Sequence, residues 1–252
     1  MRVALAGKGG TGKTTIAATL ARAAARRGVP VVAIDADSNP NLAAALGLPP
    51  GIVPAPLPTG LVSRRLQGPA LSRSLDEVLD EHAITAPDGV RLTAMGMPRH
   101  ANEGCLCSAH ATVSATLADL GTRPEVLTLV DMEASPEHLS RGTTRHVDVL
   151  LLITEPYYRS LETVRRMGLL AAELPIARVG VVANKVRSER DRQAIADFCA
   201  RHDLTLIGSV PWSDAVIEAD LAATPLIERT TDGATAAITA LLPDLLAAAP
   251  SA

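Results

Sequence analysis

A glycine- and lysine-rich run at residues 7–14, GKGGTGKT, limits the folds open to this chain most strongly. It matches the pattern G-x-x-x-x-G-K-[ST], follows an apolar run at residues 2–6 and precedes a segment with helical spacing at residues 13–27. Glycines let successive backbone N–H groups turn inward around an anion, and a helix start adds a favourable dipole. The sequence therefore predicts a strand, a phosphate-binding loop and a helix, in that order.

Apolar runs alternate with helical patterns along the rest of the chain. The expected strands are residues 30–34, 90–94, 126–130, 147–153, 178–183 and 204–208, and the expected helices are 74–83, 108–121, 159–173, 189–202 and 233–247. Near-continuous apolar strands are typical of a parallel sheet covered on both faces. We predict a single-domain α/β P-loop NTPase over residues 1–252, with a mostly parallel sheet, helices on both faces and an irregular proline-rich insertion at 49–60.

Composition narrows the class of protein further. The formal net charge is −3, without the basic excess of a general nucleic-acid binder. No apolar run approaches the roughly 18 residues of a membrane span, and the first apolar run is too short for a signal peptide. The three cysteines form an odd, low count that favours a reducing compartment. We expect a cytoplasmic protein without membrane contact, and nucleic acid is an unlikely partner.

The loop pattern assigns a task to each of its residues. Lys13 is expected to contact the β- and γ-phosphates as both a nucleotide-binding and a catalytic residue. Thr14 is expected to ligate Mg²⁺ through its hydroxyl, and Thr15 to hold the α-phosphate. The remaining nucleotide-binding positions are the backbone groups of Gly9, Gly10, Thr11 and Gly12. A glycine-rich turn without a ligand is the alternative interpretation.

Carboxylates follow two of the predicted strands. Asp35 and Asp37 come after the strand at 30–34, and Asp131 ends the strand at 126–130. Because the carboxyl ends of parallel strands meet at one edge of a sheet, these side chains should converge on one crevice. Turn formation or helix capping is the alternative for each aspartate, and Glu133 is open between a switching and a packing role.

Lys8 adds a second lysine to the loop, and residues 7–15, GKGGTGKTT, resemble the deviant Walker A ATPases. That family includes MinD, ParA, the nitrogenase iron protein, the arsenite and tail-anchor ATPases and the nickel-insertion ATPases. The resemblance implies that Lys8 acts catalytically on the nucleotide of a second chain in a homodimer, as an arginine finger does. It also implies that Asp37 orients the attacking water and that Asp35 and Asp131 hold Mg²⁺, largely through waters. A solvated loop lysine is the alternative for Lys8.

The resemblance extends to the base of the nucleotide. It implies that Asn184 meets the edge of adenine and that Pro211 flanks the ring. An Asn-Lys pair at 184–185 fits ATP better than GTP, and a turn residue is the alternative for Asn184.

Cys105 and Cys107 stand two residues apart, which in an extended segment points both sulfurs to one face. Two thiolates cannot complete a tetrahedral site, but a two-fold dimer would supply four, suited to Zn²⁺ and open to Ni²⁺. The spacing alone is a weak motif, because packing thiols or a strained disulfide would produce it too. His110 could join the metal, although a lone histidine in a first helical turn is more often a surface residue or a cap partner.

Three further segments resemble the nickel-insertion ATPases of carbon monoxide dehydrogenase maturation. They are residues 104–107 (GCLC), 130–145 (VDMEASPEHLSRGTTR) and 155–165 (EPYYRSLETVR). The resemblance implies an ATP-hydrolysing homodimer that holds a metal and serves a metalloenzyme client, carbon monoxide dehydrogenase being the candidate. The proline-rich stretch at 49–60 matches no motif of that family.

Two other functions stay open at this point. A ParA- or MinD-type positioning or regulatory ATPase is the first, although the tail at 234–252 has no Lys or Arg for membrane attachment. An iron–sulfur reductase or scaffold like the nitrogenase iron protein is the second, since four thiolates could hold a cluster. Cys199 is expected in the core, and Trp212 as packing or lid material.

Overall fold

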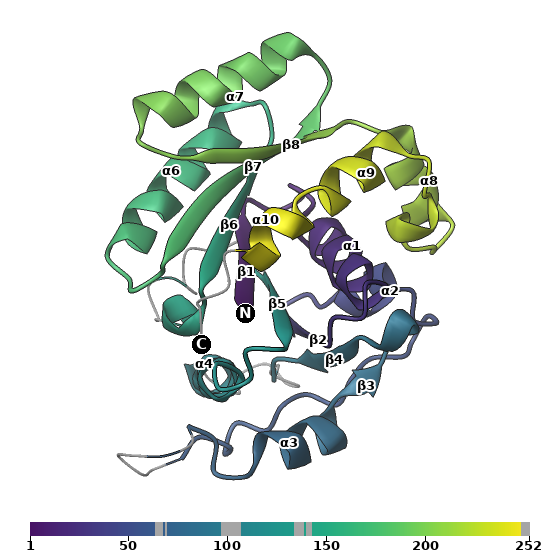
Figure 1. Cartoon of the computed structure of the whole chain (residues 1–252), viewed down its shortest axis with the longest axis vertical. Helices are drawn as coiled ribbons and strands as arrows, with labels where there is room; N and C mark the ends of the chain where they lie inside the picture. Colours follow the sequence, from purple (N-terminus) through teal and green to yellow (C-terminus); the bar gives the residue numbers. More distant parts are fainter. Residues whose placement is uncertain (64–67, 69, 97–106, 134–138, 140–142, 248–252) are drawn as a thin grey trace.

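The computed structural model describes residues 1–63, 68, 70–96, 107–133, 139 and 143–247. The strands of these residues form one eight-stranded sheet in the order β3-β4-β2-β5-β1-β6-β7-β8 (Figure 1). All neighbours run parallel except β3 and β4, which are antiparallel. The strands are β1 (Arg2–Gly7), β2 (Val31–Ala36), β3 (Ile84–Thr85), β4 (Arg91–Ala94), β5 (Leu127–Met132), β6 (Val149–Thr154), β7 (Arg178–Val186) and β8 (Leu206–Pro211).

Helices pack on both faces of this sheet (Figure 1). One face carries α1 (Lys13–Ala25), α2 (Leu42–Leu46), α9 (Gly233–Thr239) and α10 (Leu242–Ala247). The other carries α3 (Leu75–His82), α4 (Cys107–Leu120), α6 (Tyr158–Ala172) and α7 (Glu189–Arg201). The remaining described helices are α8 (Asp214–Leu221) and the short 3₁₀ turns η1 (Pro87–Gly89), η2 (Thr143–His146) and η3 (Leu226–Glu228).

The core consists of two layers because the central strands are apolar on both sides. In β1, Val3 and Leu5 pack toward α1, whereas Ala4 and Ala6 pack toward α4 and α6. The strand β6 is buried along its whole length and divides in the same alternating way. This two-sided burial is what near-continuous apolar strands require, so the predicted α/β fold with a mostly parallel sheet is confirmed.

The predicted strands and helices are present with small shifts at their ends, and three described elements besides the 3₁₀ turns were not predicted. The helices α2 and α8 and the two-residue edge strand β3 are too short to give a clear period. The helix predicted over 233–247 is wrong, because it is divided into α9 and α10. Pro243 causes this division, since it has no N–H to donate to the preceding turn.

The proline-rich insertion at 49–60 has neither helix nor strand, as predicted. It is nevertheless fixed to the sheet, because the N–H of Leu57 donates to the carbonyl of Ala94 at 2.9 Å and the Leu57 side chain is buried. No helix within the described residues is long and apolar enough to cross a membrane.

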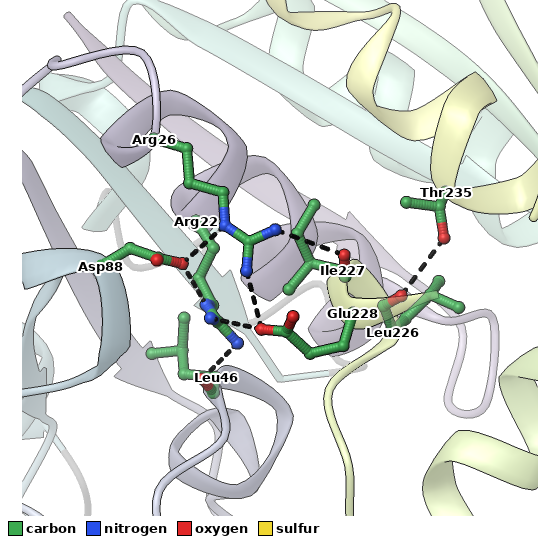
Figure 2. A network of polar contacts seen from close by, with 8 residues as sticks. All are labelled: Arg22, Arg26, Leu46, Asp88, Leu226, Ile227, Glu228 and Thr235. Atoms are coloured by element: carbon green, nitrogen blue, oxygen red, sulfur yellow. Dashed lines mark hydrogen bonds and ion pairs between the residues drawn. The ribbon is translucent and has the colours of Figure 1, made fainter. Parts of the chain in front are cut away.

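The C-terminal end of α1 is fixed by a network of ion pairs (Figure 2). Arg22, whose side chain is only 5% exposed, contacts Asp88 and Glu228 at 2.6 Å each. Arg26 contacts the same two carboxylates at 3.0 and 2.7 Å, and Arg22 also donates to the carbonyl of Leu46 in α2. The network therefore joins α1 to α2, η1 and η3.

Candidate active site

The loop between β1 and α1 has the backbone shape of an anion cradle. Gly7 and Gly12 have φ angles of 148° and 93°, in the region that favours glycine. A Cβ at Gly7 would stand 2.3 Å from the carbonyl oxygen of Ile153, and one at Gly12 would stand 2.4 Å from Nδ2 of Asn184. Both the conformation and the space therefore require glycine at these two positions.

The first turn of α1 opens onto this loop. It has neither a side-chain cap nor an acidic residue, so its backbone N–H groups and the helix dipole are directed at the cavity described below. The side chain of Lys13 is buried beside them, and its Nζ donates to the carbonyl of Lys8 at 3.4 Å. Burial lowers the pKa of Lys13, and the nearby carboxylates of Asp131 and Asp37 oppose this shift. This arrangement suits a triphosphate.

Asp35 and Asp131 lie side by side at the carboxyl ends of β2 and β5, where they are register partners. The predicted convergence of these carboxylates is therefore present. Asp35 is buried and accepts hydrogen bonds from the N–H groups of Leu42, at 2.9 Å, and Asp37, at 3.3 Å. Burial raises the pKa of Asp35 to about 6, although these two hydrogen bonds act in the opposite direction. Asp35 thus also fixes the start of α2.

Asp131 is fully buried, and neither carboxylate oxygen has a hydrogen bond of ordinary geometry. Burial raises the pKa of Asp131 to about 7, while the nearby Thr14 hydroxyl and Lys13 oppose the shift. A buried, unsatisfied carboxylate is costly unless a cation or a hydrated cation completes it. The residues at this edge therefore fit Mg²⁺, which prefers oxygen ligands and retains its own waters.

Asp37 is half-exposed after the end of β2, and it lines the cavity described below. Its Oδ1 accepts from the N–H of Asn39 at 2.8 Å, so it forms a turn as well as facing the cavity. The next residue, Ser38, donates its hydroxyl to Oε1 of Glu133 at 2.7 Å. This bond joins the segment after β2 to the segment after β5.

A cavity of about 560 Å³ extends from the loop toward α8. It is lined by the loop, by Asp37 and Asn184, by residues 210–213 and 224–226 and by part of α8. Pro211, the last residue of β8, is among the lining residues, and its expected position beside the base stays a prediction.

Trp212 also lines this cavity, and the sequence interpretation treated it only as packing or lid material. The guanidinium carbon of Arg187 lies 3.9 Å from the centroid of the Trp212 ring. The indole N–H donates to Asp214 at 3.0 Å. Position next to Pro211 was the one available signal for this residue.

Asn184 and Lys185 hold the outer side of the loop. Nδ2 of Asn184 donates to the carbonyl of Thr11 at 2.6 Å, and Nζ of Lys185 donates to the carbonyl of Gly10 at 2.6 Å. The strand β7 continues to Val186, beyond the predicted end at residue 183, and so carries both residues to the loop. The nitrogen of Asn184 is thus committed to the loop, which the prediction did not include.

The nickel and zinc prediction falls partly outside the described residues, because Cys105 lies there. Cys107 is exposed and is the first residue of α4. His110, one turn later, is buried, and its Nδ1 lies 3.4 Å from the Thr143 hydroxyl. The surface position favoured for His110 is therefore wrong. The parts of the chain that the structure describes contain no group of three or more His, Cys, Asp or Glu residues placed to hold a metal.

Cys199 is buried in the core, as predicted. Burial raises the pKa of its thiol to about 11. A thiol of this kind is inert at neutral pH, which separates Cys199 from the metal chemistry proposed for the other two cysteines.

A glycine cradle at a helix start, a buried lysine beside it and buried carboxylates on the adjacent strands together define a P-loop ATPase. The chain belongs to the CobQ/CobB/MinD/ParA nucleotide binding domain family, whose profile matches residues 3–226. Mg²⁺ and ATP are accordingly its expected cofactor and substrate.

Comparison with known proteins gives two informative sequence relatives and a solved structure with a similar fold. The chain is 38% identical over 233 residues to the carbon monoxide dehydrogenase accessory protein CooC of Rhodospirillum rubrum, covering 88% of each chain. It is 33% identical over 235 residues to an uncharacterised ATP-binding protein of Methanocaldococcus jannaschii, covering 90% of this chain and 91% of that one. The MinD cell division protein of Aquifex aeolicus shares the fold with a TM-score of 0.74 at 21% identity, over 98% of this chain and 97% of that chain.

Proposed function

We propose that this ATPase is a dimeric switch that handles a metal ion and delivers nickel to carbon monoxide dehydrogenase or a similar client. The similarity to the CooC accessory protein, over 88% of both chains, carries this proposal. The Cys-x-Cys segment at residues 105–107 supports it, because it supplies the soft ligands that such a cargo needs. We propose further that residues 1–252 act as one domain in the cytoplasm.

The nucleotide site is assigned as follows. Lys13 contacts the β- and γ-phosphates, Thr15 contacts the α-phosphate, and the backbone from Gly9 to Gly12 surrounds the chain of phosphates. Thr14, Asp35 and Asp131 hold Mg²⁺, which neutralises charge on the transferring phosphoryl group when it is bound. The buried, unsatisfied oxygens of Asp131 support this assignment.

Two catalytic groups complete the site. Asp37 orients the attacking water from the wall of the cavity, and its half-exposed position supports this role. Lys8 acts on the phosphates bound to a second chain, where its charge stabilises the transition state.

Asn184 recognises adenine. The base lies between the phosphate-binding loop on one side and Pro211 and Trp212 on the other. Because Nδ2 of Asn184 is already donated to the Thr11 carbonyl, its oxygen is the group that remains for the base. An acceptor at this point matches the amino group of adenine and opposes the carbonyl of guanine.

The metal site uses Cys105 and Cys107 from each of two chains. Cys107 is exposed and is the first residue of α4. Four thiolates at a two-fold axis make a closed site for Ni²⁺ or Zn²⁺. Contact between the segment after β5 and α4, through Thr143 and His110, supports coupling of this site to the nucleotide.

Metal analysis of anaerobically purified protein tests this function. We expect about one nickel or zinc ion per dimer in the wild type, no metal in the double variant Cys105→Ser/Cys107→Ser, and full metal in the control Cys199→Ala. ATP hydrolysis should be measured on the same samples. Full metal in the double variant would exclude the cysteine site, and iron with sulfide in the wild type would instead indicate a cluster scaffold.

A further inference from the structure

The three residues after β6, Glu155-Pro156-Tyr157, lie between two lysines of the phosphate-binding region. Glu155 contacts Lys185, and Tyr157 contacts Lys8. Neither contact was predicted, because the partners are separated by 30 and 149 residues. The two contacts differ in strength, and this difference suggests what each does.

The contact to Lys185 is short and partly buried. Nζ of Lys185 lies 2.8 Å from Oε1 of Glu155, whose side chain is 14% exposed, and 2.6 Å from the carbonyl of Gly10. Lys185 also has a φ of 57°, which is unusual for a residue other than glycine. A loop that turns its N–H groups inward turns carbonyls outward, and these need donors. Glu155 therefore holds Lys185 on one of the outward carbonyls.

The contact to Lys8 is longer and more exposed. Nζ of Lys8 lies 3.5 Å from the hydroxyl of Tyr157 and 5.6 Å from its ring centroid. A cation–π contact at an exposed site changes an equilibrium by only about two- to fivefold. Such a contact holds the lysine in its own chain yet yields readily to a stronger partner.

We infer that Glu155 and Tyr157 are positioning residues for these two lysines. Glu155 fixes the shape of the phosphate-binding loop through Lys185. Tyr157 keeps Lys8 within its own chain until a nucleotide on a second chain takes it, and so opposes premature dimerisation. The part played by Tyr157 rests on the proposed action of Lys8 across a dimer, whereas the part played by Glu155 does not.

Dimerisation measured with a non-hydrolysable ATP analogue tests Tyr157. Two lysines are released per dimer, so Tyr157→Leu should lower the dimer Kd by about 4- to 25-fold. Tyr157→Phe retains the ring and should have a smaller effect. Tyr158→Leu is the matched control, since Tyr158 is 72% exposed and is the next residue along, and it should leave the dimer Kd unchanged.

The outcomes distinguish a failure of Tyr157 to hold Lys8 from a failure of Lys8 to act across a dimer. A dimer Kd that is unchanged or raised in Tyr157→Leu, with a wild type that dimerises, overturns the hold on Lys8 alone. A wild type that stays monomeric at saturating analogue overturns the action of Lys8 across a dimer, and the role of Tyr157 with it.

Nucleotide titrations test Glu155 independently of any dimer. Glu155→Gln and Lys185→Met should each weaken ADP binding by about 5- to 10-fold, and the double variant should be no weaker than either single one. Adenosine, which lacks phosphates, should bind all of them as it binds the wild type. Glu162→Gln, which alters a comparable ion pair in α6, should change nothing. Equal losses for ADP and adenosine, or additive losses in the double variant, would refute the positioning role.

Discussion

Charged side chains lie at both ends of helix α1, but those at one end are paired with each other and the carboxylate near the other end is not. At the C-terminal end, Arg22 and Arg26 pair with Asp88 and Glu228 (Figure 2). Burial pushes the pKa of Asp88 upward, but the hydrogen bonds from the two arginines outweigh this and hold it below its usual value. At the N-terminal end, Asp131 is buried without a hydrogen bond of ordinary geometry, and burial raises its pKa.

This difference distinguishes charged residues that stabilise the fold from charged residues whose partner is a bound ligand. In a paired network each charged group has a hydrogen-bonding partner of opposite charge, and the network stabilises the chain segments that it joins. A buried carboxylate without a partner destabilises the folded protein, and it persists at places where a substrate or metal will complete it. One helix thus joins a structural region to a reactive one.

Removing the charge of Arg22 should give the largest effect. Arg22→Met removes a buried guanidinium that donates to Asp88, Glu228 and the Leu46 carbonyl, and it should lower the free energy of unfolding by about 3 kcal/mol, as measured by urea denaturation. The folded fraction should retain ATPase activity. The control Arg26→Met, at a side chain that is 34% exposed, should cost about 1 kcal/mol or less. Equal costs for the two variants would contradict the ranking by burial.

Replacing Asp131 should reduce activity rather than stability. Asp131→Asn should lower kcat/KM for ATP about 100-fold or more, because the Mg²⁺ site loses a carboxylate, yet leave the nucleotide-free protein at least as stable. Enzyme kinetics and thermal unfolding on the same preparation measure both. A variant that is less stable but fully active would show that Asp131 serves the fold and not the site.

The stability of the nucleotide-free protein should depend on pH in a direction set by these carboxylates. The folded-state pKa values of Asp131, about 7, and Asp35, about 6, lie above those of an unfolded chain. The folded protein therefore binds more protons between about pH 4 and pH 7, and the free energy of unfolding should fall as pH rises through that window. Urea denaturation at several pH values measures the slope, which should be smaller in Asp131→Asn. A free energy of unfolding that rises with pH across this window would be inconsistent with burial of these groups.

Fluorescence should show the smallest effect and locate the base. Trp212 is the only tryptophan of the chain, so its emission reports on this cavity alone. ADP should change the emission, and Arg187→Ala should weaken ADP binding by about threefold, because the indole loses its cation–π partner. An emission spectrum that ignores saturating ADP would place the base elsewhere.

The sequence alone predicts the reactive end of α1 well and the paired end poorly. The glycine pattern, and the aspartates after apolar strands, are local signals that depend on residues close in the chain. Their convergence follows from parallel strand order, and the register of Asp35 with Asp131 confirms it. Arg22 lies 66 and 206 residues from its two carboxylate partners, and no local period relates them.

The same limit applies within the site. Asn184 reaches the loop across 173 residues of sequence, and His110 is buried by contact with η2 rather than by its own helix pattern. Short elements such as α8 also escape detection, and Trp212 was undervalued for that reason. Long-range side-chain contacts therefore account for most of what the sequence did not predict.

Calorimetric titration of Mg-ADP at pH 7 in buffers of different ionisation enthalpy tests the central claim most directly. If Mg²⁺ completes the buried carboxylates, binding should release about half a proton from Asp131, whose pKa is about 7. In Asp131→Asn, binding should be at least about tenfold weaker and should release no proton from this position. A wild type that does not bind Mg-ADP, or an Asp131→Asn variant with unchanged affinity and proton release, would contradict the account.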